Sequence, residues 1–418
     1  MRGAGEIDPA RLPALRRRMI WTLFAISAFG TTGYIAAVTA GTLVAAEMAG
    51  TASAGGLPTT TTTIGTAMAA SLLSMFMLRV GRRPGMLVGI AGGALGGLVA
   101  FTSILVGSLP LLLLGSAMTG FANGAGQLGR YVAADTAVPE RRAATIGTVV
   151  WGTTVGAVAG PNLVAPAGVI GEALGLPALA GAYLLTLVFI SLSFAIAFVF
   201  LRPEPYLLAD QSALRARTDA GPAPGLGVLF RYPAVRVALV TMVAGQVVMV
   251  LIMTMTPLHL SDHGHGLETV GLVLSAHTFG MFALSPITGR LTDRFGSPRV
   301  IAAGLGTLAV AAVLAAVAPP DGGALLTIAL FLLGYGWNLG FVAGSALLTR
   351  GLALAERTRV QGVADGAIWS TAALASLSSG VIVAYASYTV LGLLAVALLV
   401  APSLLLLARG RALARAAT

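Results

Sequence analysis

The chain has 418 residues, of which 57% are hydrophobic and only 10% are charged, and it contains no cysteine. This composition excludes an ordinary soluble domain, in which about 25% of residues are charged. The lack of cysteine excludes a disulfide framework and thiol chemistry. The formal net charge is +10. Because the basic residues lie between apolar runs, we attribute this charge to membrane topology and expect no nucleic-acid partner.

Apolar runs recur along almost the whole chain, and a helix of about 20 such residues crosses the roughly 30 Å hydrocarbon core of a bilayer. The runs of the first half are 19–46, 58–78, 85–107, 109–132, 143–167 and 177–201. Those of the second half are 234–257, 266–289, 300–318, 323–347, 360–383 and 386–408. We therefore predict an all-α integral membrane protein with about 12 transmembrane helices in two sets of six.

The basic residues predict the orientation of these helices. All 25 are Arg, and they lie before the first run, in or next to every second connection and after the last run. An excess of Arg in short connections marks the cytoplasmic side of a membrane. We expect a multi-pass protein of the bacterial inner (plasma) membrane, with its N-terminus (1–18) and its C-terminus (409–418) in the cytoplasm.

The longest connection predicts a division near the middle of the chain. Residues 203–233 are rich in Pro, Gly and charged residues, which is typical of a cytosolic linker. The linker separates an N-terminal six-helix half (19–202) from a C-terminal six-helix half (234–408).

Several residues recur at nearly the same offset in the two halves. Gly81 and Asn123 have counterparts 215 residues later, in Gly296 and Asn338. Matches at one offset are the signature of an internal duplication. The two halves are therefore expected to be pseudo-symmetric repeats.

A charged turn, TGRLTDRFGSPR at 288–299, carries the most specific motif. It resembles the loop signature Gly-x-Leu-x-Asp-Arg-x-Gly-x-x-Arg of the major facilitator superfamily, and the chain resembles that family over its full length. The matching residues include Gly289, Asp293, Arg294 and Gly296. The resemblance implies a cytosolic latch, in which Asp293 engages the start of helix 5 near Arg141 and Arg142.

The equivalent turn of the first half departs from this signature. Gly81, Arg82 and Arg83 are present, but Leu78 stands where the signature has Asp. Asp365, near the cytosolic end of helix 11, is our candidate for the missing carboxylate, with Arg82 or Arg79 as its partner.

Glycines in helix 5 carry a second resemblance. Their spacing, together with the proline that follows, is similar to that of the drug/proton antiporters of the superfamily, which implies export of small amphipathic molecules in exchange for protons. The residues are Gly147, Gly156, Gly160 and Pro161. Close helix packing is the alternative explanation, because small residues let helix backbones approach one another.

Polar side chains inside the apolar runs are candidate site residues, because they are costly in a membrane. His277 is a candidate for proton coupling, and a neutral imidazole bonded within the bundle is the alternative. Helices 1, 4, 7 and 10 line the cavity in the resembled family. Polar residues on these helices are expected to line a substrate cavity here, or else to bond helix to helix: Tyr34, Asn123, Gln127, Gln246, Trp337 and Asn338.

These features predict a secondary active transporter that works by alternating access, most simply a proton-coupled exporter. Uptake or facilitated diffusion of a neutral metabolite or vitamin by the same fold is the alternative. The expected partners are a small-molecule substrate, protons and the lipid bilayer, and the expected functional unit is a monomer. We expect no enzymatic activity, no cofactor and no metal site.

Overall fold

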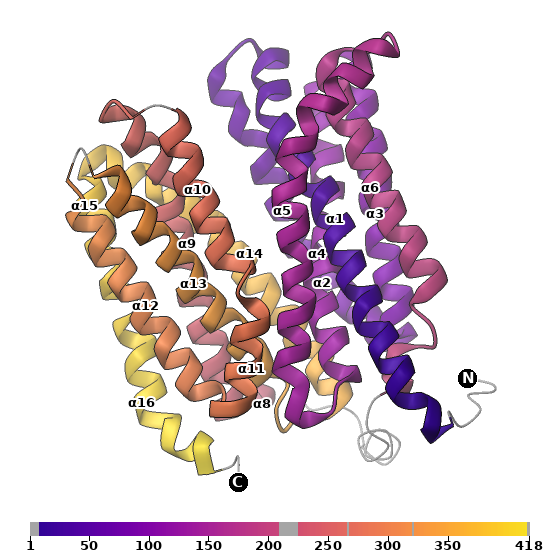
Figure 1. Ribbon diagram of the computed structural model, residues 1–418, viewed down its shortest axis with the longest axis vertical. Coiled ribbons are helices and arrows are strands. Elements are labelled where there is room, and N and C mark those ends of the chain that lie inside the picture. Colours follow the sequence, from indigo (N-terminus) through magenta and orange to yellow (C-terminus); the bar gives the residue numbers. More distant parts are fainter. Residues whose placement is uncertain (1–7, 209–224, 266, 320–321, 416–418) are drawn as a thin grey trace. The chain divides into compact units, whose positions relative to one another are not determined.

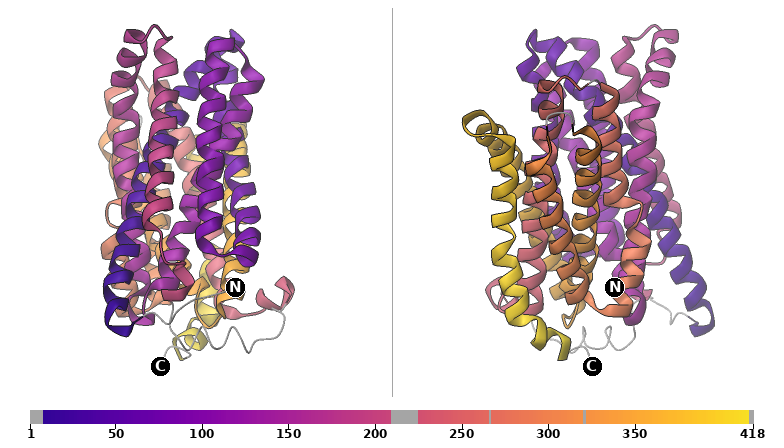
Figure 2. Two further views of the ribbon diagram at one scale, coloured as in Figure 1. Left: turned by 90° about the vertical axis from the view of Figure 1, so that its right-hand side faces the viewer. Right: turned by 60° about the vertical axis from the view of Figure 1, so that its left-hand side comes forward.

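The computed structural model covers the whole chain and describes residues 8–208, 225–265, 267–319 and 322–415. Every regular element in these ranges is a helix (Figures 1 and 2), so the predicted all-α architecture is confirmed. Residues 1–7 and 416–418 of the expected termini and 209–224 of the expected linker lie outside the described residues.

The chain forms two compact units. Unit 1 consists of Met1–Ala223 and Gly351–Gly362, and unit 2 consists of Pro224–Arg350 and Val363–Thr418. One helix, α14, therefore begins in unit 1 and continues into unit 2. The domain boundaries expected at 202 and 234 stay a prediction.

Unit 1 is built on six long helices. They are α1 (Leu12–Ala49), α2 (Leu57–Val80), α3 (Arg82–Val106), α4 (Leu109–Thr136), α5 (Arg142–Ala173) and α6 (Ala178–Phe200). Four short 3₁₀ turns connect or precede them, namely η1 (Pro9–Arg11), η2 (Ala52–Gly56), η3 (Pro139–Arg141) and η4 (Pro205–Leu208). The helices of this unit run side by side along its length (Figure 2).

Unit 2 begins with the one-turn helix α8 (Leu226–Leu229). Its longer helices are α9 (Pro233–Asp262), α10 (Leu267–Phe282), α11 (Ser285–Phe295), α12 (Ser297–Val317), α13 (Gly323–Leu348), α14 (Leu354–Tyr385), α15 (Tyr388–Leu398) and α16 (Val400–Arg415). The expected crossing at 266–289 is interrupted after Phe282. Pro286 has no N–H and so cannot donate the helical hydrogen bond to the carbonyl oxygen of Phe282.

Eleven helical segments of the described chain are long and apolar enough to cross a membrane. A twelfth helix, α4, spans 28 residues but is more polar, because it carries Asn123, Gln127, Arg130 and Asp135. These twelve segments lie where the sequence predicts crossings, α10 with α11 and α15 with α16 each forming one. The chain is therefore a multi-pass helical membrane protein.

Large apolar side chains on the outside of the helices agree with a lipid environment. On α14, Leu374, Leu377 and Val381 are 63%, 64% and 58% exposed, and their spacing puts them on one helix face. Such a stripe would be costly in water but not against lipid tails.

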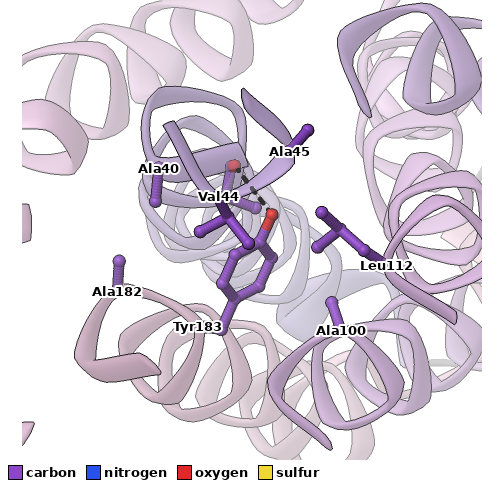
Figure 3. Packing of buried hydrophobic residues seen from close by; sticks show 8 residues of the cluster. Ala40, Val44, Ala45, Ala100, Leu112, Ala182 and Tyr183 are labelled. Carbon is purple, nitrogen blue, oxygen red and sulfur yellow. Dashed lines mark hydrogen bonds between the residues drawn. The ribbon is translucent and has the colours of Figure 1, made fainter. Parts of the chain in front are cut away.

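A cluster of buried apolar residues fills part of the interior of unit 1. Ala40 and Val44 of α1, Ala100 of α3 and Leu112 of α4 surround the ring of Tyr183 from α6 (Figure 3). The Tyr183 hydroxyl donates a hydrogen bond of 3.4 Å to the Ala37 carbonyl oxygen, which satisfies its polar end. This cluster fixes α6 against the N-terminal helix.

The same glycine turn ends α2 and α11. Gly81 has φ 108° and ψ 169°, and Gly296 has φ 83° and ψ 147°. In both turns the glycine N–H bonds at 2.9 Å to the carbonyl four residues earlier. Side chains are nearly excluded from this backbone region, so both turns require glycine, and they lie 215 residues apart.

Replacing either glycine by Ala should destabilise the protein by about 1–3 kcal/mol through backbone strain. Gly81→Ala should cost more than Gly296→Ala, because its Cβ would lie 2.9 Å from Glu204 Oε1. Thermal unfolding of the purified protein in detergent measures both effects. Gly306→Ala, at an open position on helix α12, is the control and should lose nothing; equal stability of all three variants would contradict the argument.

Candidate functional site

A hollow inside unit 1, which we call the unit 1 hollow, is lined by eleven residues from α1, α3, α4, α5 and α6. Six of them carry a hydroxyl or carboxamide group: Ser27, Thr31, Asn123, Gln127, Thr153 and Ser193. The others are apolar or glycine, and none of the eleven is charged. The hollow is therefore polar but uncharged.

Hydrogen bonds hold several of these side chains in place. Asn123 Nδ2 donates to Thr66 Oγ1 at 3.2 Å, and Ser193 Oγ donates to the Ile26 carbonyl oxygen at 3.0 Å. Gln127 Oε1 accepts from Arg130 Nη1 at 3.2 Å. Two of the expected cavity residues, Asn123 and Gln127, thus line the hollow, whereas Tyr34 does not. Their contact with substrate stays a prediction.

A second hollow, the unit 2 hollow, lies among α9, α12 and α13 and has an aromatic wall. The Trp337 ring stacks on Phe341 with centroids 4.4 Å apart, and Phe282 meets it edge-on at 5.8 Å. Trp337 Nε1 donates to Gln246 Oε1 at 2.8 Å. Two further expected cavity residues, Gln246 and Trp337, therefore bond to each other.

The two hollows occupy the same place in the duplicated chain. Six residues of the unit 1 hollow have a counterpart 215 residues later in the unit 2 hollow. The pairs are Ile26 with Thr241, Ser27 with Met242, Gly30 with Gly245, Ile90 with Leu305, Ala122 with Trp337, and Gly126 with Phe341. The offset read from the sequence thus extends to the walls of both hollows.

Asn338 lies at the break between α10 and α11. Its Nδ2 donates to the Met281 carbonyl oxygen and to Ser285 Oγ, both at 2.6 Å, and its Oδ1 accepts from Thr288 Oγ1 at 2.6 Å. These bonds satisfy the Met281 carbonyl oxygen and the hydroxyl groups of Ser285 and Thr288, which lie near Pro286 in the sequence. The fully buried amide thus ties α13 to the interrupted helix, and its contact with substrate stays a prediction.

His277 on α10 is only 1% exposed. Its Nδ1 lies 3.0 Å from the Leu330 carbonyl oxygen. Because a carbonyl oxygen only accepts, Nδ1 carries the proton of the neutral ring. Nε2 has no hydrogen-bond partner in the described part of the chain. The ring is therefore oriented by α13 with its second nitrogen unused.

A buried charge cluster gathers around Asp135 at the end of α4. Arg82 donates from Nε and Nη2 to Asp135 Oδ2 at 3.0 and 2.6 Å. Arg82 Nη2 also donates to Gln361 Oε1 at 2.7 Å, and Arg357 Nη1 lies 3.9 Å from Asp135 Oδ1. Arg357 and Gln361 are on the part of α14 that belongs to unit 1, so this cluster fastens the start of α14 to α3 and α4.

The carboxylate that Arg82 binds is thus Asp135, which sequence analysis does not single out. The expected crossing ends at residue 132, whereas α4 continues to Thr136 and carries Asp135 into the protein interior. A lone acid just beyond an apolar run is the one signal that the sequence offers. Asp365 is also buried, in unit 2, and its role stays a prediction.

Glu204, just after α6, binds the start of α3. Its carboxylate accepts from the backbone N–H groups of Arg82 and Arg83 at 2.5 and 3.2 Å. An anion is favoured at a helix N-terminus. Burial nevertheless raises the pKa of the Glu204 carboxyl above its ordinary value, against these hydrogen bonds and the nearby guanidinium groups, which lower it.

The charged turn that resembles the superfamily signature closes α11. Gly289 is buried on this helix, Asp293 and Arg294 lie in its last turn, and Gly296 ends it. The Arg294 guanidinium lies 5.2 Å from the centre of the Phe295 ring. The expected contact between Asp293 and the start of α5, at Arg141 and Arg142, joins residues of different units and stays a prediction.

The glycines of α5 face α1 at close range. A Cβ on Gly156 would lie 2.5 Å from Thr31 Cβ, and one on Gly160 would lie 2.8 Å from Ile35 Cβ. Gly147 is also buried, and Pro161 lies inside a helix that runs on to Ala173. Close packing therefore accounts for Gly156 and Gly160, and the antiporter resemblance stays a prediction.

Comparison with known proteins identifies relatives over almost the whole chain. The family model described as Major Facilitator Superfamily matches residues 20–270 and 237–417. The MFS-type transporter YddS of Bacillus subtilis is 35% identical over 395 residues, which cover 93% of this chain and 90% of that protein. The riboflavin transporter RfnT of Brucella anthropi is 30% identical over 365 residues, which cover 87% and 88% of the two chains.

A solved structure shows the same fold. The human organic anion transporter MFSD10 superposes with a TM-score of 0.73 at 17% identity, covering 94% of this chain and 99% of that one. The twelve helical segments, the duplicated turn and hollow, and the family match agree with one another. The chain therefore belongs to the major facilitator superfamily and is a membrane transporter, not an enzyme.

Proposed function

We propose that this transporter moves small, uncharged or weakly charged organic molecules by alternating access. The observation that carries the proposal is the chemistry of the unit 1 hollow, whose wall holds six hydroxyl or carboxamide groups and no charge. A strongly charged solute would need an opposite charge when it leaves water. Its membrane would be the bacterial inner membrane, with both chain ends in the cytoplasm and one chain as the working unit.

A vitamin is the first substrate to test. The Brucella relative is a riboflavin transporter at 30% identity, and riboflavin combines an uncharged ring system with a chain of hydroxyl groups. Gln127 and Asn123 from α4 and Tyr34 from α1 are the side chains that we assign to contact such a solute. In unit 2 we assign Gln246, Trp337 and Asn338 to the substrate cavity.

Proton-coupled export of amphipathic compounds is the second candidate. The glycine spacing of α5 favours it, and His277 offers an imidazole nitrogen, Nε2, that has no hydrogen-bond partner in the described part of the chain. An imidazole can take up a proton near physiological pH when its surroundings change. The side chain would then bind a proton in one state of the transport cycle and release it in another.

The Asp135 cluster supports a conformational latch in this cycle. Asp135 holds Arg82 and lies beside Arg357 on the start of α14. Breaking the cluster would release these first turns of α14 from unit 1. Asp293 with Arg141 and Arg142, and Asp365 with Arg82, remain the further latch contacts that we propose.

Solute flux into proteoliposomes tests the proposed function. The panel of labelled solutes contains riboflavin, neutral nucleosides, neutral dyes and uncharged antibiotics. Wild-type protein should carry at least one of them down the concentration gradient of that solute, whether the gradient points into or out of the vesicle. A panel of dicarboxylates and phosphorylated sugars serves as the charged comparison. Transport of the charged solutes alone would contradict the assignment.

Replacing His277 by Asn should abolish the pH dependence of transport if the ring carries the coupling proton. Asn keeps a donor for the Leu330 carbonyl oxygen but does not bind a proton at neutral pH. Uptake is measured between pH 5.5 and 8.5 for wild type and variant. A pH profile that the substitution leaves unchanged would remove His277 from the proton path.

Replacing Asp135 by Ala should destabilise the protein by about 3–5 kcal/mol, because Arg82 would stay buried without its carboxylate. Chemical unfolding in detergent measures this loss. The double variant Asp135→Asn with Arg82→Gln removes both charges and should recover much of the stability. An Asp135→Ala protein as stable as wild type would show that the ion pair does not support the fold.

A further inference from the structure

The unit 1 hollow and the unit 2 hollow share their backbone positions but differ in chemistry. Where unit 2 has Trp337 and Phe341, unit 1 has Ala122 and Gly126. The aromatic side chains that form the wall of one hollow are therefore missing from the other. Where unit 2 has Met242, unit 1 has the hydroxyl of Ser27.

The missing rings leave space beside α4. A Cβ built on Gly126 would meet no atom within 4 Å, apart from its own helix backbone. Most buried glycines of unit 1 are different, because a Cβ there would strike a neighbouring helix; at Gly156 it would lie 2.5 Å from Thr31 Cβ. Gly126 thus faces an opening rather than a packed interface.

Polar atoms at this opening are available for hydrogen bonds. Ser27 is only 4% exposed, and within the described part of the chain neither its hydroxyl nor that of Thr31 has a hydrogen-bond partner. Asn123 uses its Nδ2 on Thr66 and keeps its Oδ1 for another group. Buried hydroxyl and amide groups favour a partner that can donate and accept at once.

We propose that the unit 1 hollow is a binding subsite for the hydroxyl-bearing part of an uncharged solute, such as a polyol or sugar-like chain. The proposal rests on the proposed transport function and adds to it the part of the substrate that this unit recognises. Ser27, Thr31 and Asn123 bind a hydroxyl group of the solute, because the hollow's volume of about 20 Å³ admits a group about the size of one water molecule. Gly126 borders the open side of the hollow, along which the rest of the solute's chain lies. A carboxylate or phosphate is disfavoured, since no lining residue carries charge.

The substitution Gly126→Phe tests the subsite by placing in unit 1 the ring that unit 2 carries at Phe341. Riboflavin and lumiflavin are the probes, because they share a ring system and only riboflavin has the hydroxylated chain. Binding to purified protein is followed by flavin fluorescence. Gly126→Phe should weaken riboflavin binding by about tenfold, the effect of one or two lost hydrogen bonds, and change lumiflavin binding by much less.

Gly306→Phe on α12 is the matched control, since Gly306 is exposed and a Cβ there also meets open space. It should bind both flavins as wild type does. If Gly126→Phe weakened the binding of riboflavin and lumiflavin equally, or the binding of neither, the subsite would be overturned.

A second measurement does not depend on flavin binding. The chain has no cysteine, so Ser27→Cys creates a single thiol, whose reaction with a small methanethiosulfonate reagent reports access to the hollow. Riboflavin or ribitol should slow this reaction several-fold, and the apolar solute toluene should not. A rate that neither hydroxylated compound changes would refute the subsite. If the subsite is refuted but the wild-type protein transports solutes of the neutral panel, the proposed function survives. If the wild-type protein transports none of them, the subsite and the proposed function both fail.

Discussion

The ion pair between Asp135 and Arg82 is the interaction on which the organisation of unit 1 depends. Both residues are nearly inaccessible, at 2% and 3% exposure, and a buried charge is tolerated only with a partner. The pair joins α3 to α4, and through Gln361 and Arg357 it holds the first turns of α14 as well. α14 continues into unit 2. The contact that satisfies a buried charge in unit 1 therefore also fixes the position of the first turns of this helix.

Duplication explains how one fold carries two different hollows. The glycine turns at Gly81 and Gly296 and the paired residues of the two hollows keep one offset along the chain. Backbone geometry is therefore shared between the copies, while side chains have diverged. The unit 1 hollow combines small residues with hydroxyl and amide groups, whereas the wall of the unit 2 hollow carries Trp337 and Phe341.

The positions of the helices could be read from the sequence, because hydrocarbon forces every crossing to satisfy its own backbone. Apolar runs therefore locate the helices, and the spacing of Gly289, Asp293 and Gly296 indicates the family. Polar positions on α4 also point to a cavity, and Asn123 and Gln127 line the unit 1 hollow.

Pairings between distant residues could not be read in this way. Asp135 meets Arg82 and Arg357 across 53 and 222 residues, and no local pattern encodes such a contact. Nor does the sequence show that the Asn338 amide bonds Met281 and Ser285 at the helix break before Pro286. Likewise, spacing alone could not show that Gly156 and Gly160 lie against α1. In each case the partner of a buried polar group, or of a closely packed glycine, lies far away in the sequence.

Hydrogen exchange of residues 351–362 tests most directly whether Asp135 holds the start of α14. The backbone amides of this segment are followed by mass spectrometry in wild type and in Asp135→Asn. We predict faster exchange in the variant over these residues, with unchanged protection around Tyr183, whose cluster lies elsewhere in unit 1. Identical exchange of residues 351–362 in the two proteins would contradict the account.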